Sequence, residues 1–220
     1  MKVILFGATG MVGQGVLREC LLDPEVETVL AVSRKPLGKS DPKLREILRP
    51  NVGDLVEVET QLQGYDACFF CLGVSSVGMR EEDYRRVTYD LTISVARTLV
   101  KLNPGMTFIY VTGTGTDSTE QGRTMWARVK GRTENELLRM PFKTACMFRP
   151  GAIQALDGIV SRTPVYRWLY FVFAPLFTLL RLISPGLVTT TRQIGQAMIL
   201  VAKRGAPKPI LESSDINALR

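Results

Sequence analysis

The amino-acid sequence predicts an α/β fold in which helices cover both faces of a doubly wound parallel sheet. Apolar runs of strand length alternate with stretches that repeat apolar residues at the helical period, which is typical of βαβ units. A glycine-rich turn also joins the first strand to the first helix, where such sheets place a ligand. With 220 residues, 45% of them hydrophobic, we expect one domain over residues 1–220.

The elements follow one another with clear stop signals. The first helix ends at Asp23-Pro24 and the long helix at Asn103-Pro104-Gly105, because proline cannot continue a helix. The third strand lacks a clean alternation of apolar residues. We expect strands at 2–6, 28–33, 43–48, 66–72, 107–112 and 143–148, helices at 11–22, 81–102 and 123–139, and then a helix at 191–203 and a strand at 209–211.

The composition excludes several kinds of chemistry. The chain has no histidine, which removes imidazole bases, Ser/His/Asp triads and nearly every zinc site, so we predict no metal site. The 28 Lys and Arg exceed the 21 Asp and Glu but are scattered, so we expect no nucleic-acid partner. Cys68 and Cys71 lie three apart on an expected strand and therefore face opposite sides of the sheet, which argues against a redox pair.

The length of the first apolar run indicates the cellular compartment of the protein. Residues 3–6 are too few for the apolar region of a secretory signal, and a glycine follows them. We therefore expect a cytoplasmic protein.

The glycine-rich turn, VILFGATGMVG, has the form GxxGxxG. Gly7 permits a tight turn, Gly10 lets the backbone approach a pyrophosphate, and Gly13 allows the helix to pack closely. The backbone N–H groups that face the anion at the helix start lie near Thr9, Met11 and Val12. Because the motif directly follows the first strand, it predicts a dinucleotide cofactor. The alternative is a tight turn that binds nothing.

The end of the second strand bears on the choice of cofactor. An NAD-dependent protein normally has a carboxylate here, which bonds the adenosine ribose. This chain instead has Ser33, Arg34 and Lys35, and two cations without an acid suit a 2′-phosphate. We therefore predict NADP in preference to NAD, and the alternative is a solvated basic loop.

Taken together, these motifs resemble the atypical short-chain dehydrogenases/reductases, a Rossmann-fold family related to the NAD-dependent epimerases and dehydratases, and within it the group of the human Tat-interacting protein of this fold. The resemblance covers most of the chain and rests on the order and spacing of the motifs. They are GATGMVG, SRKP, the Gly53-Asp54-Leu55 segment, CLG at 71–73, VTGTGT, WARVKGRTENEL and FRPGAI.

The resemblance implies further cofactor contacts. In the family an Asp-Leu pair contacts the adenine, which corresponds here to Asp54 and Leu55. The residues after the fourth strand lie against the cofactor, and here they are Leu72, Gly73 and Val74. The backbone near the nicotinamide corresponds to the segment from Pro150 to Ile153.

The resemblance also implies a catalytic group from which this chain departs. In the family a tyrosine moves the proton, a lysine four residues later lowers the pKa of that tyrosine and holds the nicotinamide ribose, and a Ser or Thr polarises the substrate carbonyl. Lys130 keeps the lysine position, and Thr112 or Thr114 supplies the hydroxyl, but Trp126 stands in the tyrosine position. An indole N–H donates a hydrogen bond and cannot cycle a proton.

A tyrosine of the long helix is one substitute for the missing phenol. The family's helix often carries an asparagine for a proton relay, whereas this chain has VTYD at 87–90. Tyr84 or Tyr89 replaces the phenol if the fold turns it inward, and otherwise both pack along the helix.

Two functions remain open for this sequence. The first is an NADP(H)-dependent oxidoreductase that acts on an unidentified small molecule with an altered proton donor. The second is a non-catalytic NADP(H)-sensing or partner-binding protein. Lys130 and the glycines favour cofactor binding in both cases, and Trp126 favours the second.

An aromatic stretch precedes the C-terminal helix. Its longest uncharged run, 168–180, has 13 residues and contains Pro175, whereas a membrane span needs about 20. We expect residues 155–188 to form a small helical cap on the substrate side, as the resemblance implies. The alternative is peripheral membrane contact through residues 165–183, with aromatic rings in the headgroup zone.

Overall fold

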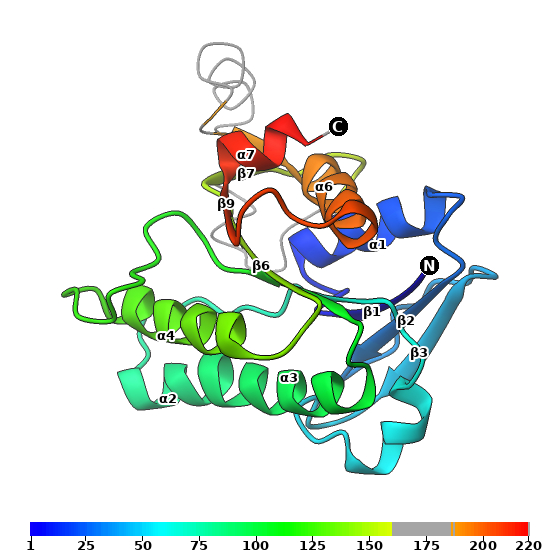
Figure 1. Ribbon diagram of the computed structural model, residues 1–220, viewed down its shortest axis with the longest axis horizontal. Coiled ribbons are helices and arrows are strands. Elements are labelled where there is room, and N and C mark those ends of the chain that lie inside the picture. The colour runs from blue at the N-terminus through cyan, green and yellow to red at the C-terminus, as the bar shows by residue number, and fades with distance from the viewer. Residues whose placement is uncertain (160–185, 187, 220) are drawn as a thin grey trace.

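The computed structural model describes residues 1–159, 186 and 188–219, and its centre is a seven-stranded sheet in which every neighbouring pair is parallel (Figure 1). The strand order is β3-β2-β1-β4-β5-β6-β9. It reverses between β1 and β4, so the predicted doubly wound sheet is confirmed. The strands are β1 (Lys2–Phe6), β2 (Thr28–Ser33), β3 (Leu44–Leu48), β4 (Ala67–Phe70), β5 (Thr107–Val111), β6 (Thr144–Arg149) and β9 (Ile210–Glu212).

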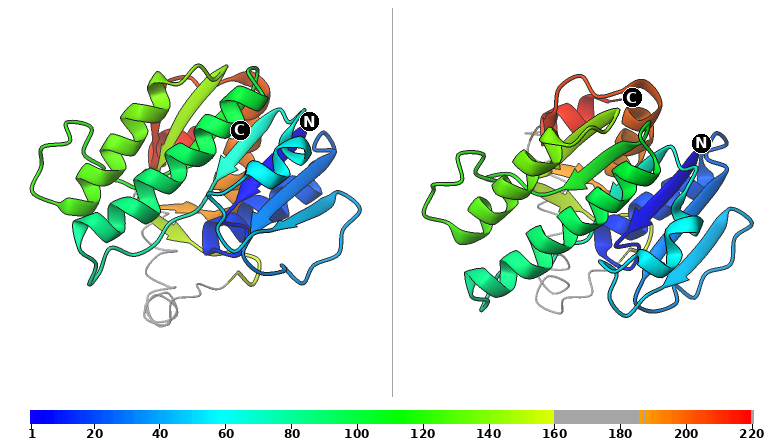
Figure 2. Two further views of the ribbon diagram at one scale, coloured as in Figure 1. Left: turned by 90° about the horizontal axis from the view of Figure 1, so that it is seen from below. Right: turned by 60° about the horizontal axis from the view of Figure 1, so that its bottom comes forward.

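Helices cover both faces of this sheet. Among the described residues, α1 (Met11–Leu22) and α6 (Thr191–Arg204) pack on one face, with α7 (Ser213–Ala218) beside α6. The 3-10 helix η1 (Val56–Leu62), α3 (Leu91–Leu102) and α4 (Met125–Arg139) pack on the other face. Figure 2 shows α3 and α4 lying side by side.

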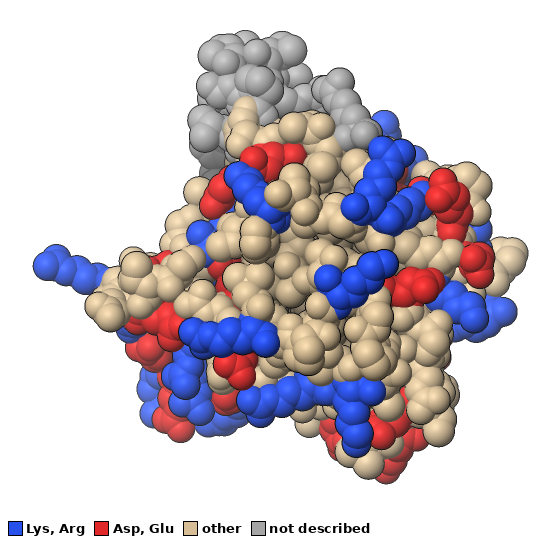
Figure 3. Space-filling view, in the orientation of Figure 1, with Lys and Arg blue, Asp and Glu red and all other residues tan. Residues whose placement is uncertain are grey.

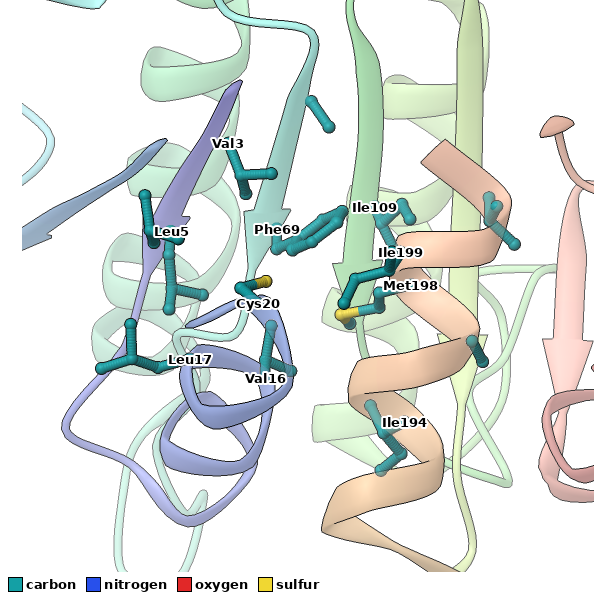
Figure 4. Close-up of a cluster of buried hydrophobic side chains, with 14 of the residues drawn as sticks. Val3, Leu5, Val16, Leu17, Cys20, Phe69, Ile109, Ile194, Met198 and Ile199 are labelled. Carbon is teal, nitrogen blue, oxygen red and sulfur yellow. The ribbon is translucent and has the colours of Figure 1, made fainter. Parts of the chain in front are cut away.

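The strands are apolar on both faces because both faces are buried. In β1, Val3 and Leu5 join the core on the α1 and α6 side, whereas Ile4 and Phe6 join the opposite core. Figure 4 shows the first of these cores, where side chains of α1 and α6 meet Phe69 and other residues of the sheet. Such continuous apolar strands are expected in a parallel sheet covered on both sides.

The expected long helix at 81–102 contains a wide turn. Helix α2 (Glu81–Arg85) continues into the π-helical turn η2 (Arg86–Asp90) and then into α3. Two further strands, β7 (Ala152–Gln154) and β8 (Val188–Thr190), pair in a separate parallel ladder that the sequence analysis did not predict. Three-residue strands are too short to produce a periodic signal.

The predicted cap at 155–188 lies mostly outside the described residues, and the predicted membrane contact at 165–183 lies wholly outside them. Within the part of the chain that the structure describes, no helix is long and apolar enough to cross a membrane. On the face shown in Figure 3, Lys and Arg are interleaved with Asp and Glu, in keeping with the scattered charge of the sequence.

Candidate functional site

The glycine-rich turn lies at the carboxyl end of β1, next to the end of β4. Gly7 has a φ of +82°, and Gly10 N donates to Gly7 O at 2.9 Å. Gly10 is the N-cap residue of α1, and no side chain caps this end of the helix. The first N–H groups of α1, including those of Met11 and Val12, therefore lack a side-chain partner in the described residues, as an anion-binding helix start requires.

The three glycines are needed for different reasons. A Cβ at Gly7 would lie 2.6 Å from the Cys71 carbonyl carbon, and a Cβ at Gly13 would lie 2.0 Å from Gly7 O. Gly10 has an ordinary φ of −79°, and its Cβ would lie 3.4 Å from Gly7 O. The protein's own packing thus requires glycine at positions 7 and 13 but not at 10. The space in front of Gly10 fits the close approach of a phosphate.

The carboxyl end of β2 presents two cations. Ser33 is buried, and its Oγ donates to Lys35 O at 2.7 Å, which fixes the turn. Arg34 and Lys35 are exposed, and neither forms an ion pair with another described residue. Arg49, by contrast, is held by Glu57 at 2.5 Å. Arg34 and Lys35 therefore remain available to an anionic ligand.

The segments assigned by resemblance differ in their placement. Leu55 is only 2% exposed and belongs to the core, whereas Asp54 is exposed and lies 3.8 Å from Arg49. Leu72 is half-buried, and Gly73 and Val74 are exposed at the end of β4. The backbone N of Leu72 would lie 2.7 Å from a Cβ at Gly7, so the fold brings these two turns together. Asp54 can face a ligand with its side chain, and Leu55 only with its backbone.

Lys130 lies on α4 and points to the end of β5. Its Nζ donates to Thr112 O at 2.9 Å. Burial lowers the pKa of Lys130 from 10.5 to about 8, and the nearby Glu134 carboxylate opposes this shift. A buried ammonium held by one carbonyl keeps further N–H donors for a ligand.

The two candidate hydroxyls have different surroundings. Thr112 is buried, and its Oγ1 donates to Glu134 Oε1 at 2.6 Å. Thr114 is exposed, with its Oγ1 3.1 Å from Arg149 O and 3.2 Å from Glu212 Oε2. Both hydroxyls have acceptors within the protein, but only that of Thr114 is exposed, so this geometry favours Thr114 as the group that meets a substrate.

Trp126 lies one helical turn before Lys130 on α4. It is half-buried, and its Cη2 would lie 3.6 Å from a Cβ placed on Gly115. Gly115 has a φ of +87°, which favours glycine. The absence of a Cβ at this position leaves room beside the indole. The indole therefore packs against the loop that connects β5 to α4 and carries Thr114.

Neither tyrosine of the long helix is free to replace the phenol. Tyr84 is 1% exposed, burial raises its pKa, and it hydrogen-bonds Thr88 of the same helix. The Tyr89 ring lies under the Arg132 guanidinium, 4.9 Å from its centroid. Both side chains pack along the helix.

The loops after β5 and β6 are joined to each other. Thr114 N donates to Pro150 O at 3.0 Å, and Ile153, on β7, packs against the core on the α1 and α6 side. The end of β6 therefore lies beside the loop that carries Thr114, so Pro150 shares the edge of the sheet with the other predicted residues.

Three charged residues of this edge were missed by the sequence analysis. Glu134 is fully buried and forms a short ion pair with Arg149, whose guanidinium also contacts Ser118 and lies 3.8 Å from Glu212. Glu134 had a sequence signal, because it follows Lys130 by four residues on one helix face. Glu212 had none, since it lies 98 residues after its contact Thr114.

A separate hollow of about 630 Å³ lies between α1 and α6. None of the predicted site residues line it. Its walls are formed by Glu19, Leu22, Asp23, Gln193, Gln196, Ile199, Leu200, Lys203 and Leu219.

The glycine turn, the basic end of β2 and Lys130 all lie at the carboxyl edge of one doubly wound sheet. That sheet and its edge have the arrangement of a Rossmann fold, in which ligands bind at the carboxyl ends of the strands. No family model matches the chain. The chain is 25% identical to the protein FMP52, mitochondrial, of Debaryomyces hansenii, over 73% of this chain and 72% of that one. It is 26% identical to the protein HTATIP2 of Rattus norvegicus, over 69% of this chain and 62% of that one.

Solved structures give the same picture of the fold. The Bordetella bronchiseptica enzyme WbmF in complex with NAD+ superposes with a TM-score of 0.70 at 15% identity, over 98% of this chain and 76% of that one. A Burkholderia thailandensis oxidoreductase of the short-chain dehydrogenase/reductase family superposes with a TM-score of 0.66 at 13% identity, over 96% and 90%. The predicted resemblance is therefore confirmed: the chain is similar in sequence to HTATIP2 and FMP52, and it has the Rossmann fold of the short-chain dehydrogenases/reductases.

The relatives overturn the predicted compartment. Five of them, all FMP52 proteins, are named as mitochondrial, so the prediction of a cytoplasmic protein is wrong. The prediction rested on a first apolar run of strand length. That run forms β1, and a core strand carries no information about the compartment.

Proposed function

We propose that the protein is an NADP(H)-binding oxidoreductase that does not use Trp126 to move a proton. The observation that carries this proposal is the placement of Lys130, whose buried ammonium lies at the end of β5 on the edge that also holds the glycine turn. Structural neighbours that bind NAD and NADH support a nicotinamide dinucleotide as the cofactor class. The choice of NADP rests on Arg34 and Lys35.

The chain's own residues then have distinct roles. The start of α1 holds the pyrophosphate through backbone N–H groups, and Arg34 with Lys35 holds the 2′-phosphate. The ammonium of Lys130 holds the nicotinamide ribose and orients the ring, and Thr114 contacts the oxygen of the substrate. The cofactor supplies hydride transfer when it is bound.

The cofactor preference can be measured directly. NADPH should bind at least tenfold more tightly than NADH, and Arg34→Ala or Lys35→Ala should each weaken NADPH about tenfold, because each removes a charge-assisted contact. Calorimetric titration of both cofactors tests this. Lys39→Ala, which removes an exposed lysine a few residues further along the chain, should leave both affinities unchanged. Equal affinities, or a preference for NADH that Arg34→Ala does not change, would contradict the proposal.

The glycines provide a test of the phosphate turn. Gly10→Ala should fold normally yet weaken NADPH binding at least tenfold, because its methyl group fits the protein but projects toward the ligand. Gly13→Ala should lower the free energy of unfolding by on the order of 3 kcal/mol, because the new Cβ would overlap Gly7 O. Denaturant titration and NADPH titration of both variants separate the two effects. Wild-type affinity in Gly10→Ala would place the cofactor elsewhere.

The second candidate is a non-catalytic NADP(H)-binding sensor or partner-binding protein. Trp126 favours it, because the resemblance implies the proton-transferring residue at this position, and an indole cannot cycle a proton. A protein of this kind keeps the cofactor affinity described above and oxidises or reduces nothing.

A further inference from the structure

The carboxylate of Glu212 lies within hydrogen-bond distance of the exposed Thr114 hydroxyl of the candidate site. Glu212 Oε2 lies 3.2 Å from Thr114 Oγ1, although the two residues are 98 positions apart. Glu212 ends β9, and its backbone is in register with Arg149 at the end of β6. Figure 1 shows β9 beside β6 at this edge. The parallel sheet thus places an acid–base group directly at Thr114.

The Glu212 carboxylate lies among other charged groups and is open to water. The Arg149 guanidinium lies 3.8 Å from Glu212 Oε1 and is also paired with the buried Glu134. On the side of α7, Asp215 is paired with Lys208 at 2.8 Å. The Glu212 side chain is 41% exposed, so a proton that it takes up can pass to water. An ionised carboxylate accepts protons, which suits the oxidation of an alcohol better than the reduction of a carbonyl.

Glu212 also has a purely structural contact. It caps α7, because its side chain accepts from the N–H of Asp215 while the Asp215 side chain accepts from Glu212 N. This capping box holds the carboxylate in place without using its basicity. A glutamine at this position keeps an acceptor oxygen for the cap, so the two roles can be separated by substitution.

We propose that Glu212, acting through Thr114, accepts the proton in an NADP+-dependent oxidation of an alcohol, a step that rests on the proposed function. The substrate hydroxyl gives its proton to Thr114 Oγ1, and Thr114 passes its own hydrogen to Glu212 Oε2. The O–H and C–H bonds of the alcohol break, the carbonyl double bond forms, and the hydride reduces the nicotinamide dinucleotide. Glu212 then loses the proton to water. This route takes over the proton transfer that a tyrosine phenol would perform at position 126.

The first test measures alcohol oxidation by the full chain with NADP+ and a panel of linear and cyclic secondary alcohols. Glu212→Gln should lower kcat by on the order of a hundredfold with little change in KM, and the fall of wild-type kcat at acid pH should be absent in the residual activity. Asp215→Asn, which alters the same capping box at its other end, should keep the wild-type rate and pH profile. Equal rates in Glu212→Gln and wild type would overturn the proposal, as would a wild type that binds NADP+ and oxidises none of the alcohols.

A second test does not depend on turnover. Trifluoroethanol, an alcohol that resists oxidation, is titrated into the NADP+ complex between pH 4 and pH 8. Its affinity should fall as the pH falls in the wild type and stay constant in Glu212→Gln, because only the wild type loses the acceptor by protonation. A parallel loss of affinity in both proteins would overturn the proposal. Absence of NADP+ binding in the wild type would instead show that the proposed function itself has failed.

Discussion

Trp126→Tyr is expected to create or raise carbonyl reductase activity by on the order of a hundredfold to ten-thousandfold, the usual contribution of general acid catalysis. The substitution places a phenol one helical turn before Lys130, on the same face of α4. The Lys130 ammonium lowers the pKa of a phenol beside it, so the new tyrosine can protonate the oxygen that hydride transfer leaves negative. NADPH oxidation with a panel of small aldehydes and quinones measures the gain.

Lys130 provides the control for this gain. Trp126→Tyr combined with Lys130→Met should lose the new activity, because the phenol is then no longer tuned. If the wild type already reduces the panel as fast as Trp126→Tyr, the proton comes from another group and the position of the indole does not limit the reaction.

The position of the indole has an optical consequence. Tryptophan emission overlaps the absorption of the reduced nicotinamide, so bound NADPH should strongly quench the fluorescence of the wild type. The chain has two tryptophans, and most of the quenching should disappear in Trp126→Phe and persist in Trp168→Phe. Quenching that survives in Trp126→Phe would mean that α4 does not present this residue to the cofactor.

The parallel sheet was predictable because its signals are local. Residues 3–6 and 29–32 are continuous apolar runs, which is the pattern of a buried parallel strand. Helix α1 begins and ends where Gly10 and Asp23-Pro24 predict it. The wide turn η2 has no such signal, because the sequence 86–90 contains neither proline nor glycine.

The candidate site was only partly predictable, since its residues meet through the topology of the sheet. The spacing of Trp126 and Lys130 fixes their shared helix face, but spacing alone leaves Thr112 and Thr114 equivalent. Only the fold turns the Thr112 hydroxyl toward Glu134 and leaves Thr114 exposed. Glu212 becomes part of the candidate site because β9 pairs with β6, and these two strands lie about sixty residues apart in the chain.

Lys130 should make the stability of the protein depend on pH in an unusual direction. Burial lowers its pKa from 10.5 to about 8 in the folded state. Between these two values the unfolded chain binds more protons than the folded one, so the free energy of unfolding rises with pH. Below pH 8 both states carry the proton, and the cost of burying the ammonium is fully present. Above pH 10.5 both states are neutral, and the cost is absent.

Comparison with Lys130→Met isolates this contribution. The variant also loses the hydrogen bond to Thr112 O, but that loss is nearly the same at every pH. The free energy of unfolding of the wild type, minus that of Lys130→Met, should therefore rise between pH 7 and pH 10 by on the order of 2 to 3 kcal/mol. Urea denaturation of both proteins across this range measures the difference.

The matched control is Lys143→Met, which removes an exposed lysine. The free energy of unfolding of the wild type, minus that of Lys143→Met, should not change over the same pH range. A flat difference for Lys130→Met as well would mean that the ammonium remains solvated in the protein without cofactor. Water would then compete with the nicotinamide ribose for its N–H donors. A rise seen only for Lys130→Met would instead mean that the desolvated ammonium at the end of β5 lowers the stability of the protein at neutral pH. A ligand that binds this ammonium would then offset part of the lost stability.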